Sequence, residues 1–232
     1  MKKLSLILSV VLMTAMYVTS CGRIPEETIK SEETVKSVKS EEIVRPVEVT
    51  IGKQVWMTQN LNVDKFRNGD LIPEAKTEGE WKAYGQAGEA AWCYYNNYSQ
   101  NGEKFGKLYN WYAVNDARGL APKGWHIPSD TELTALADYL GGKEKAGAKM
   151  KSKEGWNDNG NGTNSSGFSG LPGGARDASG RFYRIGELGY WWSCSEGTTV
   201  EVWSRTLFYS IGDLGRGNQD KRIGLSVRCL RD

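Results

Sequence analysis

The 232-residue sequence contains a single histidine, His126, beside nine tryptophans and eleven tyrosines. One imidazole excludes metal sites and acid–base chemistry that need several histidines, whereas carboxylate or cysteine chemistry stays open. Proline is scarce, with 6 residues against 28 glycines, and the hydrophobic fraction of 39% is ordinary for a globular protein. We therefore expect one folded domain, with appendages at most.

An excess of charge of either sign is also missing. The sequence has 30 basic and 28 acidic residues, and two basic ones, Lys2 and Lys3, lie in a leader that we expect to be removed. The remaining 28 basic residues then balance the 28 acidic residues. Because nucleic-acid binding draws its affinity from a basic face, this balance argues against nucleic acid as a partner. Gly-x-Ser-x-Gly, zincin and phosphate-loop motifs are absent from the sequence as well.

Long apolar runs are limited to the N-terminus. The basic start Met1–Lys3 is followed by the apolar run Leu4–Val18 and by Thr19-Ser20-Cys21, an order typical of a secretory signal peptide. The run has roughly 15 residues, fewer than the ~20 that a membrane-spanning helix needs. We therefore expect a protein that is not integral to the membrane.

The sequence Val18-Thr19-Ser20-Cys21 resembles a bacterial lipobox. This resemblance implies that residues 1–20 are a lipoprotein signal peptide and that Cys21 becomes an acylated N-terminus, with membrane lipid as the partner of its acyl chains. Several chains on one residue anchor firmly, since each buried methylene contributes about 0.8 kcal/mol. The alternative is an unmodified Cys21.

The segment after the cysteine has a different composition. Residues 22–46 contain no aromatic residue, five basic residues and six acidic ones, and Ser31–Lys36 is repeated approximately as Ser40–Arg45. Such a segment buries too little apolar area to offset its ordering entropy. We predict that 21–46 comprises the lipidated cysteine and a disordered tether, which leaves 47–232 as the folded domain. A short helix is the alternative, although it would be marginal in water.

The clearest helix signal of the folded domain is a capping box. The side chains of Ser129 and Glu132 can satisfy the first free amides of a helix, and an apolar stripe follows them. The pair Gly141-Gly142 supplies a left-handed stop, so we predict one clear helix over about 130–140. A weaker helical pattern covers Lys143–Lys151.

Strand patterns occur on both sides of this helix. Glu48–Leu61 alternates polar and apolar residues around Gly52, which predicts a hairpin, whereas Gly155–Gly174 is a long loop rich in Gly, Asn and Ser. Three further β-type runs are Tyr190–Cys194, Glu201–Tyr209 and Ile223–Leu230. The patterns together predict an α+β fold with a small, mostly antiparallel sheet and long loops.

Six phrases of the domain occur in one familiar order. They are Ile51–Leu61, Tyr109–Val114, Ala121–Asp130, Ser166–Gly174, Gly189–Ser193 and Ser226–Cys229. In this order they resemble the Fibrobacter succinogenes major paralogous domain, over nearly all of 47–232. The resemblance implies a C-type-lectin-like fold related to the formylglycine-generating enzymes, on secreted or lipid-anchored proteins of Bacteroidetes-like bacteria. It implies no particular activity.

The tryptophans allow two interpretations. An exposed indole can stack on a sugar ring, whereas a buried one fills a core and removes about 150–250 Å² from water. We expect core packing for most of them. Trp156, in the Gly/Asn loop, and Trp203, on a strand with Glu201 and Arg205 on the same face, are the candidate ligand-binding residues.

The Gly/Asn loop also offers oxygen ligands. Asp158, Asn159 and Asn161 carry carboxylate and amide oxygens of the kind that calcium binds, so calcium is the one candidate cofactor. Phe168 stands where an EF-hand loop would need its bidentate Glu. Tight turns use the same residues, so a turn without metal is the alternative.

With Cys21 lipidated, three cysteines remain in an oxidising export compartment, and at most one disulfide can form. Cys194 and Cys229 are the candidate disulfide, with buried thiols as the alternative. Formylglycine-generating enzymes use active-site cysteines, so the family resemblance keeps an enzyme of that type as a rival. We interpret His126, which precedes the helix cap, as structural.

These features combine into one functional hypothesis. We expect an outer-membrane lipoprotein of the bacterial cell envelope, with no catalytic residues, whose domain binds a glycan or an envelope protein. The acidic pair Glu26-Glu27 weakly resembles export signals of surface lipoproteins and suggests surface exposure. The rivals are a structural or assembly component of the envelope and a formylglycine-generating-type enzyme.

Overall fold

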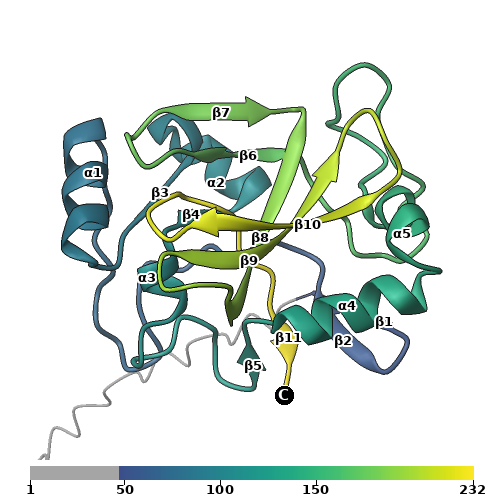
Figure 1. Ribbon diagram of the computed structural model, residues 1–232, viewed down its shortest axis with the longest axis horizontal. Helices are drawn as coiled ribbons and strands as arrows, with labels where there is room; N and C mark the ends of the chain where they lie inside the picture. Colours follow the sequence, from purple (N-terminus) through teal and green to yellow (C-terminus); the bar gives the residue numbers. More distant parts are fainter. Residues whose placement is uncertain (1–46) are drawn as a thin grey trace, which may run out of the picture. The chain divides into compact units, whose positions relative to one another are not determined.

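A computed structural model describes residues 47–232, and the predicted signal peptide, the lipidation site Cys21 and the tether lie outside these residues. The described part is a mixed α/β fold with more strands than helices (Figure 1). Its α-helices are α1 (Glu78–Ala87), α2 (Ser99–Phe105), α3 (Trp111–Val114), α4 (Asp130–Tyr139) and α5 (Lys143–Met150), and a short 3-10 helix, η1, covers Tyr95–Asn97. Within 47–232, no helix is both long enough and apolar enough to cross a membrane.

Two sheets hold most of the strands. The larger has the order β10-β9-β8-β6-β7 and consists of Leu214–Asp220, Glu201–Phe208, Leu188–Glu196, Gly173–Arg176 and Phe182–Ile185. The smaller has the order β1-β2-β11-β5 and consists of Glu48–Ile51, Gln54–Met57, Leu230–Arg231 and Trp125–His126. A third pair joins β3 (Trp92–Cys93) to β4 (Leu108–Tyr109). Strand pairing is antiparallel except between β6 and β8, which confirms the mostly antiparallel prediction, although with more than one sheet.

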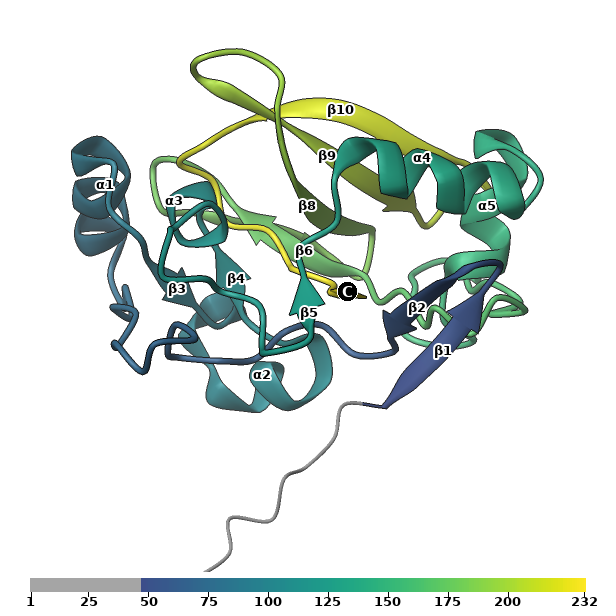
Figure 2. The same cartoon turned by 90° about the horizontal axis from the view of Figure 1, so that it is seen from below.

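The predicted capping box starts α4. The Glu132 amide donates to Ser129 Oγ, and the Ser129 amide donates in return to the Glu132 carboxylate at 2.8 Å. The left-handed Gly141 and Gly142 follow the helix, and α5 then covers most of the weaker helical pattern. Both helices lie close to the β9–β10 side of the large sheet (Figure 2).

The prediction of one clear helix is incomplete because α1 has the same signal. Thr77 and Glu80 form a second capping box, and Gly88 ends the helix in the left-handed conformation. Only Trp81 and Gly85 of α1 are buried. The helix therefore lacks the apolar stripe that made α4 recognisable.

The strand predictions hold for the hairpin and for two of the later runs. The hairpin is β1–β2, β8 covers the run at 190–194, and β9 covers the run at 201–209 except its last residue. The prediction for Ile223–Leu230 is wrong in detail, because only Leu230 enters a strand and the preceding residues make isolated bridges through the core. The edge strand β10 was missed since its Gly-rich, polar sequence lacks the usual alternation.

Tryptophan fills the core as expected. Eight of the nine indoles are buried, and only Trp203 is partly exposed. In one cluster the Phe168 ring makes edge contacts with Trp56 and Trp191, at centroid distances of 5.8 and 5.6 Å. This cluster connects the small sheet, the large sheet and the loop that follows α5.

Candidate functional site

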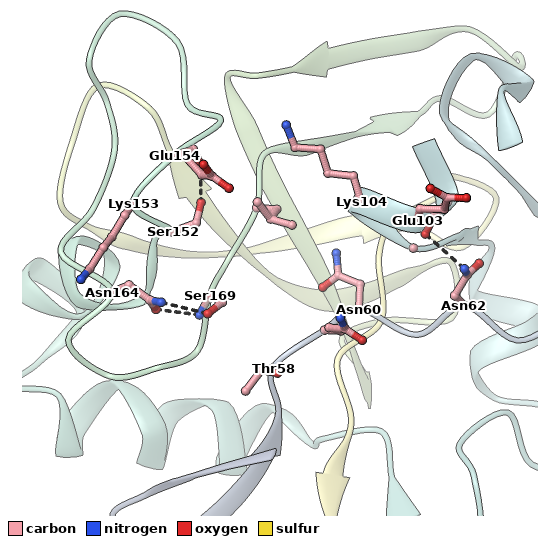
Figure 3. Close-up of a pocket in the computed structure, with 14 residues that line it drawn as sticks. Thr58, Asn60, Asn62, Glu103, Lys104, Ser152, Lys153, Glu154, Asn164 and Ser169 are labelled. Atoms are coloured by element: carbon pink, nitrogen blue, oxygen red, sulfur yellow. Dashed lines mark hydrogen bonds between the residues drawn. The ribbon is translucent and has the colours of Figure 1, made fainter. Parts of the chain in front are cut away.

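A polar groove of about 470 Å³ lies between three segments that are far apart in the sequence (Figure 3). These segments are the chain after β2, the end of α2, and the loop between α5 and β6. The lining residues are mostly polar: Thr58, Gln59, Asn60, Asn62, Gly102, Glu103, Lys104, Gly106, Ser152, Lys153, Glu154, Asn164, Ser169 and Leu171. Its volume is in the range of small-ligand pockets, although such pockets are usually more apolar.

Gly106 brings the end of α2 against the chain that follows β2. It has φ 72°, and a Cβ at this position would lie 2.7 Å from the carbonyl oxygen of Leu61. The neighbouring Lys107 amide donates to that same oxygen at 3.1 Å. Only glycine fits this close approach, so the groove depends on a local backbone requirement.

Asn60 lies in the groove and is hydrogen-bonded to three other segments of the protein. Its Nδ2 donates to the Phe105 carbonyl at 2.8 Å, and its Oδ1 accepts from Trp191 Nε1 at 2.8 Å and from Arg228 Nη2 at 2.7 Å. Arg228 is buried and also donates to the carbonyls of Met57 and Phe168. Burial lowers the pKa of Arg228 to about 9. Asn60 is therefore a structural junction.

The other two asparagines of the groove are engaged in the same way. Asn62 donates from Nδ2 to the Gly102 carbonyl at 3.1 Å, and its Oδ1 accepts from the buried Lys107 ammonium. Asn164 donates to Ser169 Oγ at 2.9 Å and accepts from the Ser169 amide at 2.8 Å. The three asparagine amides thus hold the walls of the groove together.

The charged side chains of the groove behave differently. Glu103 and Lys104 come from α2, Lys153 and Glu154 come from the loop after α5, and all four residues are exposed. Among the ion pairs of residues 47–232, none involves these four side chains. Lys153 and Glu103 lie on opposite sides of the groove (Figure 3). The groove therefore presents two ammonium groups and two carboxylates without an ion pair, although Lys104 Nζ lies 5.2 Å from the centroid of the Phe105 ring.

Sequence reasoning missed this groove and chose Trp156 instead. The exposure expected for Trp156 is wrong, because only 5% of the residue is exposed. Its Nε1 donates to Ser152 Oγ at 3.0 Å and to the Gly170 carbonyl at 3.2 Å. The ring also lies under the Lys151 ammonium, 5.4 Å from the ring centroid. Trp156 is a core residue of the loop, since residues distant in sequence cover it.

The second candidate set lies on β9. Arg205 is buried and donates to Asp130 Oδ1 at 2.5 Å and to Thr134 Oγ1 at 2.8 Å, so its assignment as a ligand-binding residue is corrected to a structural role. Trp203 is partly exposed, but the guanidinium of Arg216 covers its ring at 3.3 Å from the centroid. Glu201 is half-buried at the start of β9, and a ligand contact there stays a prediction.

The predicted calcium loop forms a tight turn. Asp158 and Asn159 have φ values of 50° and 60°, and Asn161 Oδ1 accepts from the Trp156 amide at 3.1 Å. The amide oxygen of Asn161 is thus used to fold the loop. Within residues 47–232, no group of three His, Cys, Asp or Glu side chains is arranged to hold a metal ion. Calcium at Asp158, Asn159 and Asn161 stays a prediction.

The predicted disulfide between Cys194 and Cys229 is wrong, because both are free thiols, as is Cys93. Cys194 is exposed on β8, whereas Cys229 packs into the core cluster that contains Met57 and Trp125. Burial raises the pKa of Cys229 to about 12 and that of Cys93 to about 12. Both buried thiols are therefore protonated, and poor nucleophiles, at neutral pH.

His126 lies between two carboxylates, away from the polar groove. Its Nδ1 is 2.8 Å from Asp232 Oδ1, and its Nε2 is 3.0 Å from Glu132 Oε1. Burial lowers the pKa of His126, but the hydrogen bonds and charges of the two carboxylates outweigh it and raise the pKa above its usual value. Both ring nitrogens are engaged, in agreement with a structural role.

Comparison with protein families identifies the class of this domain. The family model of the Fibrobacter succinogenes major domain matches residues 49–231, and the chain belongs to this family. The match confirms the resemblance of the six phrases. Comparisons with curated proteins and with solved structures gave no match.

Proposed function

We propose that this protein is a lipid-anchored component of the bacterial cell envelope whose domain is a non-catalytic ligand-binding module. The lipobox ending at Cys21 and the tether to residue 46 support an anchor that holds the domain away from the membrane. We further propose the outer membrane as its location and a C-type-lectin-like class for its fold, both from the family resemblance. The strand-rich mixed architecture is compatible with that class.

The single observation that carries ligand binding is the polar groove. Its asparagines are hydrogen-bonded within the protein, while its four charged side chains make no ion pair among residues 47–232. Exposed charges without partners contribute little to the stability of a fold, so these four side chains can meet a ligand without loss of stability. A ligand that meets these charges accounts for their placement.

The absence of catalysis is part of the proposal, and the cysteines support it. An enzyme of the formylglycine-generating type needs reactive thiolates, but two of the described thiols, Cys93 and Cys229, are buried with raised pKa values. The pKa of the exposed Cys194 is raised as well, by partial desolvation of its thiol and by the charge of Glu132. The lining of the groove contains neither histidine nor cysteine.

The anchor is tested with two cysteine variants in intact cells. Cys21→Ala should lose acyl labelling and leave the membrane fraction, because the acyl chains have no other site of attachment in this proposal. The matched control is Cys194→Ala, which removes an exposed thiol from the domain and should retain both properties. Acyl labelling that persists in Cys21→Ala would contradict the proposal.

Ligand binding is tested by thermal unfolding of the full-length lipoprotein in detergent, against panels of bacterial, plant and host polysaccharides and of short peptides. A ligand that binds only the folded state raises the midpoint by mass action. Chelation in parallel shows whether any shift needs calcium. A shift with one ligand class supports a binding module, and no shift with any ligand would favour a structural or assembly role.

A further inference from the structure

We propose that the polar groove binds a short peptide with a free amino group and a free carboxylate. This inference rests on the proposed ligand-binding function and specifies its ligand class. It depends on which groups of the groove remain available after the fold has used the others.

The oxygens of the three asparagine amides are already used by the fold, whereas within residues 47–232 the amide of the exposed Gln59 is not. Asn60 donates to Phe105 and accepts from two side chains, while Asn62 donates to Gly102 and accepts from Lys107. Asn164 is bonded twice to Ser169. A ligand hydroxyl that donated to these three asparagine oxygens would compete with hydrogen bonds of the fold, at a cost comparable to its gain.

An aromatic platform is also missing from the groove. Its lining includes no Trp, Tyr or Phe side chain, and Leu171 is its only large apolar residue. Trp156, next along the chain from Gly155, turns its indole into the core. A sugar ring would therefore find no face on which to stack, which favours a ligand recognised through charge.

The free charges have a polarity across the groove. The Glu103 carboxylate lies on the α2 side, and the Lys153 ammonium lies on the opposite side (Figure 3). Lys104 reaches across from α2, because a Cβ placed on Gly155 would lie 3.7 Å from Lys104 Nζ. The loop side thus holds two ammonium groups against one carboxylate, from Glu154, and the α2 side holds the Glu103 carboxylate.

This polarity fits a zwitterion placed across the groove. The carboxylate of the ligand would meet Lys153, on the side opposite Glu103, and its ammonium would meet Glu103 (Figure 3). Hydrogen bonds between charged partners are about twice as strong as neutral ones. With two charges of each sign on the groove, a ligand with no net charge leaves the complex neutral.

The test is calorimetric titration of the full-length lipoprotein in nonionic detergent. The probes are alanine peptides of increasing length with free ends, and the same peptides with an acetylated amine or an amidated carboxylate. We expect either block to weaken binding about tenfold, since each removes one charge-assisted contact. Equal affinity for free and blocked peptides would overturn the inference.

Two groove variants locate each contact. In Glu103→Gln, acetylation of the peptide should no longer matter, and in the double variant Lys104→Gln/Lys153→Gln, amidation should no longer matter. The matched control is Lys143→Gln/Glu144→Gln, which makes the same changes at exposed residues outside the groove lining and should bind like the wild type. An acetylation effect that survives in Glu103→Gln would overturn the assigned orientation and the inference with it.

The outcomes separate this inference from the function on which it rests. A neutral oligosaccharide that binds, and that groove variants abolish, would overturn the peptide ligand and leave the binding module standing. Failure of both peptides and polysaccharides to bind would overturn both proposals. Binding of free-ended peptides with the expected pattern of variants would support both.

Discussion

Two clusters on this domain each contain acidic and basic side chains, but only one of them uses its charges to hold the fold together. On the β9–β10 face, Asp130 bonds Arg205 at 2.5 Å and Arg216 at 2.8 Å, and Arg216 also covers Trp203. In the polar groove, Glu103 and Lys153 have no charged partner. The first cluster joins α4 to the large sheet, so its charges stabilise the fold. The second cluster is available for a ligand.

The comparison shows that residue type does not reveal which charges are free. Glu201, Trp203 and Arg205 looked like a binding face because they alternate along one strand. In the fold, Arg205 forms an ion pair with Asp130, which lies on a helix 75 residues earlier in the sequence. A charge is available to a ligand when the structure leaves it exposed and without a partner.

The largest expected effect comes from breaking the structural cluster. Asp130→Ala leaves Arg205 buried without its carboxylate, which should lower the free energy of unfolding by about 3 kcal/mol. The pKa of Asp130 supports this role, because Arg216 and Arg205 lower it in spite of the raising effect of burial. Urea denaturation measures the loss.

Glu103→Ala is the matched control in the groove, and its stability should stay within about 0.5 kcal/mol of the wild type. If both variants lost the same stability, the two clusters would not differ and the comparison would fail.

A smaller effect is expected from the glycine that shapes the groove. Gly106→Ala places a methyl group 2.7 Å from the Leu61 carbonyl at a backbone with φ 72°. We expect a loss of about 2 kcal/mol from strain. The change should also displace α2 and weaken ligand binding, in contrast to Asp130→Ala, which lies outside the groove. Gly69→Ala, where φ is 94° but open space surrounds the Cβ, separates strain from crowding.

The smallest expected effect on stability comes from His126, which lies between the carboxylates of Glu132 and Asp232. Its pKa is raised, so its contribution to stability is complete below the unfolded pKa of about 6.5 and is lost as the pH rises through the folded value. The difference in melting temperature between the wild type and His126→Gln should be largest near pH 6 and shrink at alkaline pH. A difference that grows with pH would contradict the assignment.

Much of the fold was predictable where the signal is local. The capping box of Ser129 and Glu132, the stop at Gly141-Gly142 and the hairpin around Gly52 each need only a few neighbouring residues. The capping box of Thr77 and Glu80 is the same local signal for α1, but the sequence of α1 lacks the apolar stripe that identifies α4. Family membership followed from the order of six short phrases.

The candidate site was not predictable in this way. Asn60 and Arg228 meet across 168 residues of sequence, and their bond decides that Asn60 serves the fold. The burial of Trp156 follows from Ser152 and Gly170, which a loop sequence does not reveal as partners. The groove needs three distant segments together, so neither its existence nor its free charges are visible in any one of them.

The most direct test of the central claim is hydrogen–deuterium exchange of the full-length lipoprotein, with and without the ligand that gives the largest thermal shift. Ligand binding in the polar groove predicts slower exchange at residues 58–62, 102–106 and 152–171, with the β9–β10 face unchanged. Protection confined to the strand around Trp203, with no change in those three segments, would contradict the assignment of the groove as the binding site.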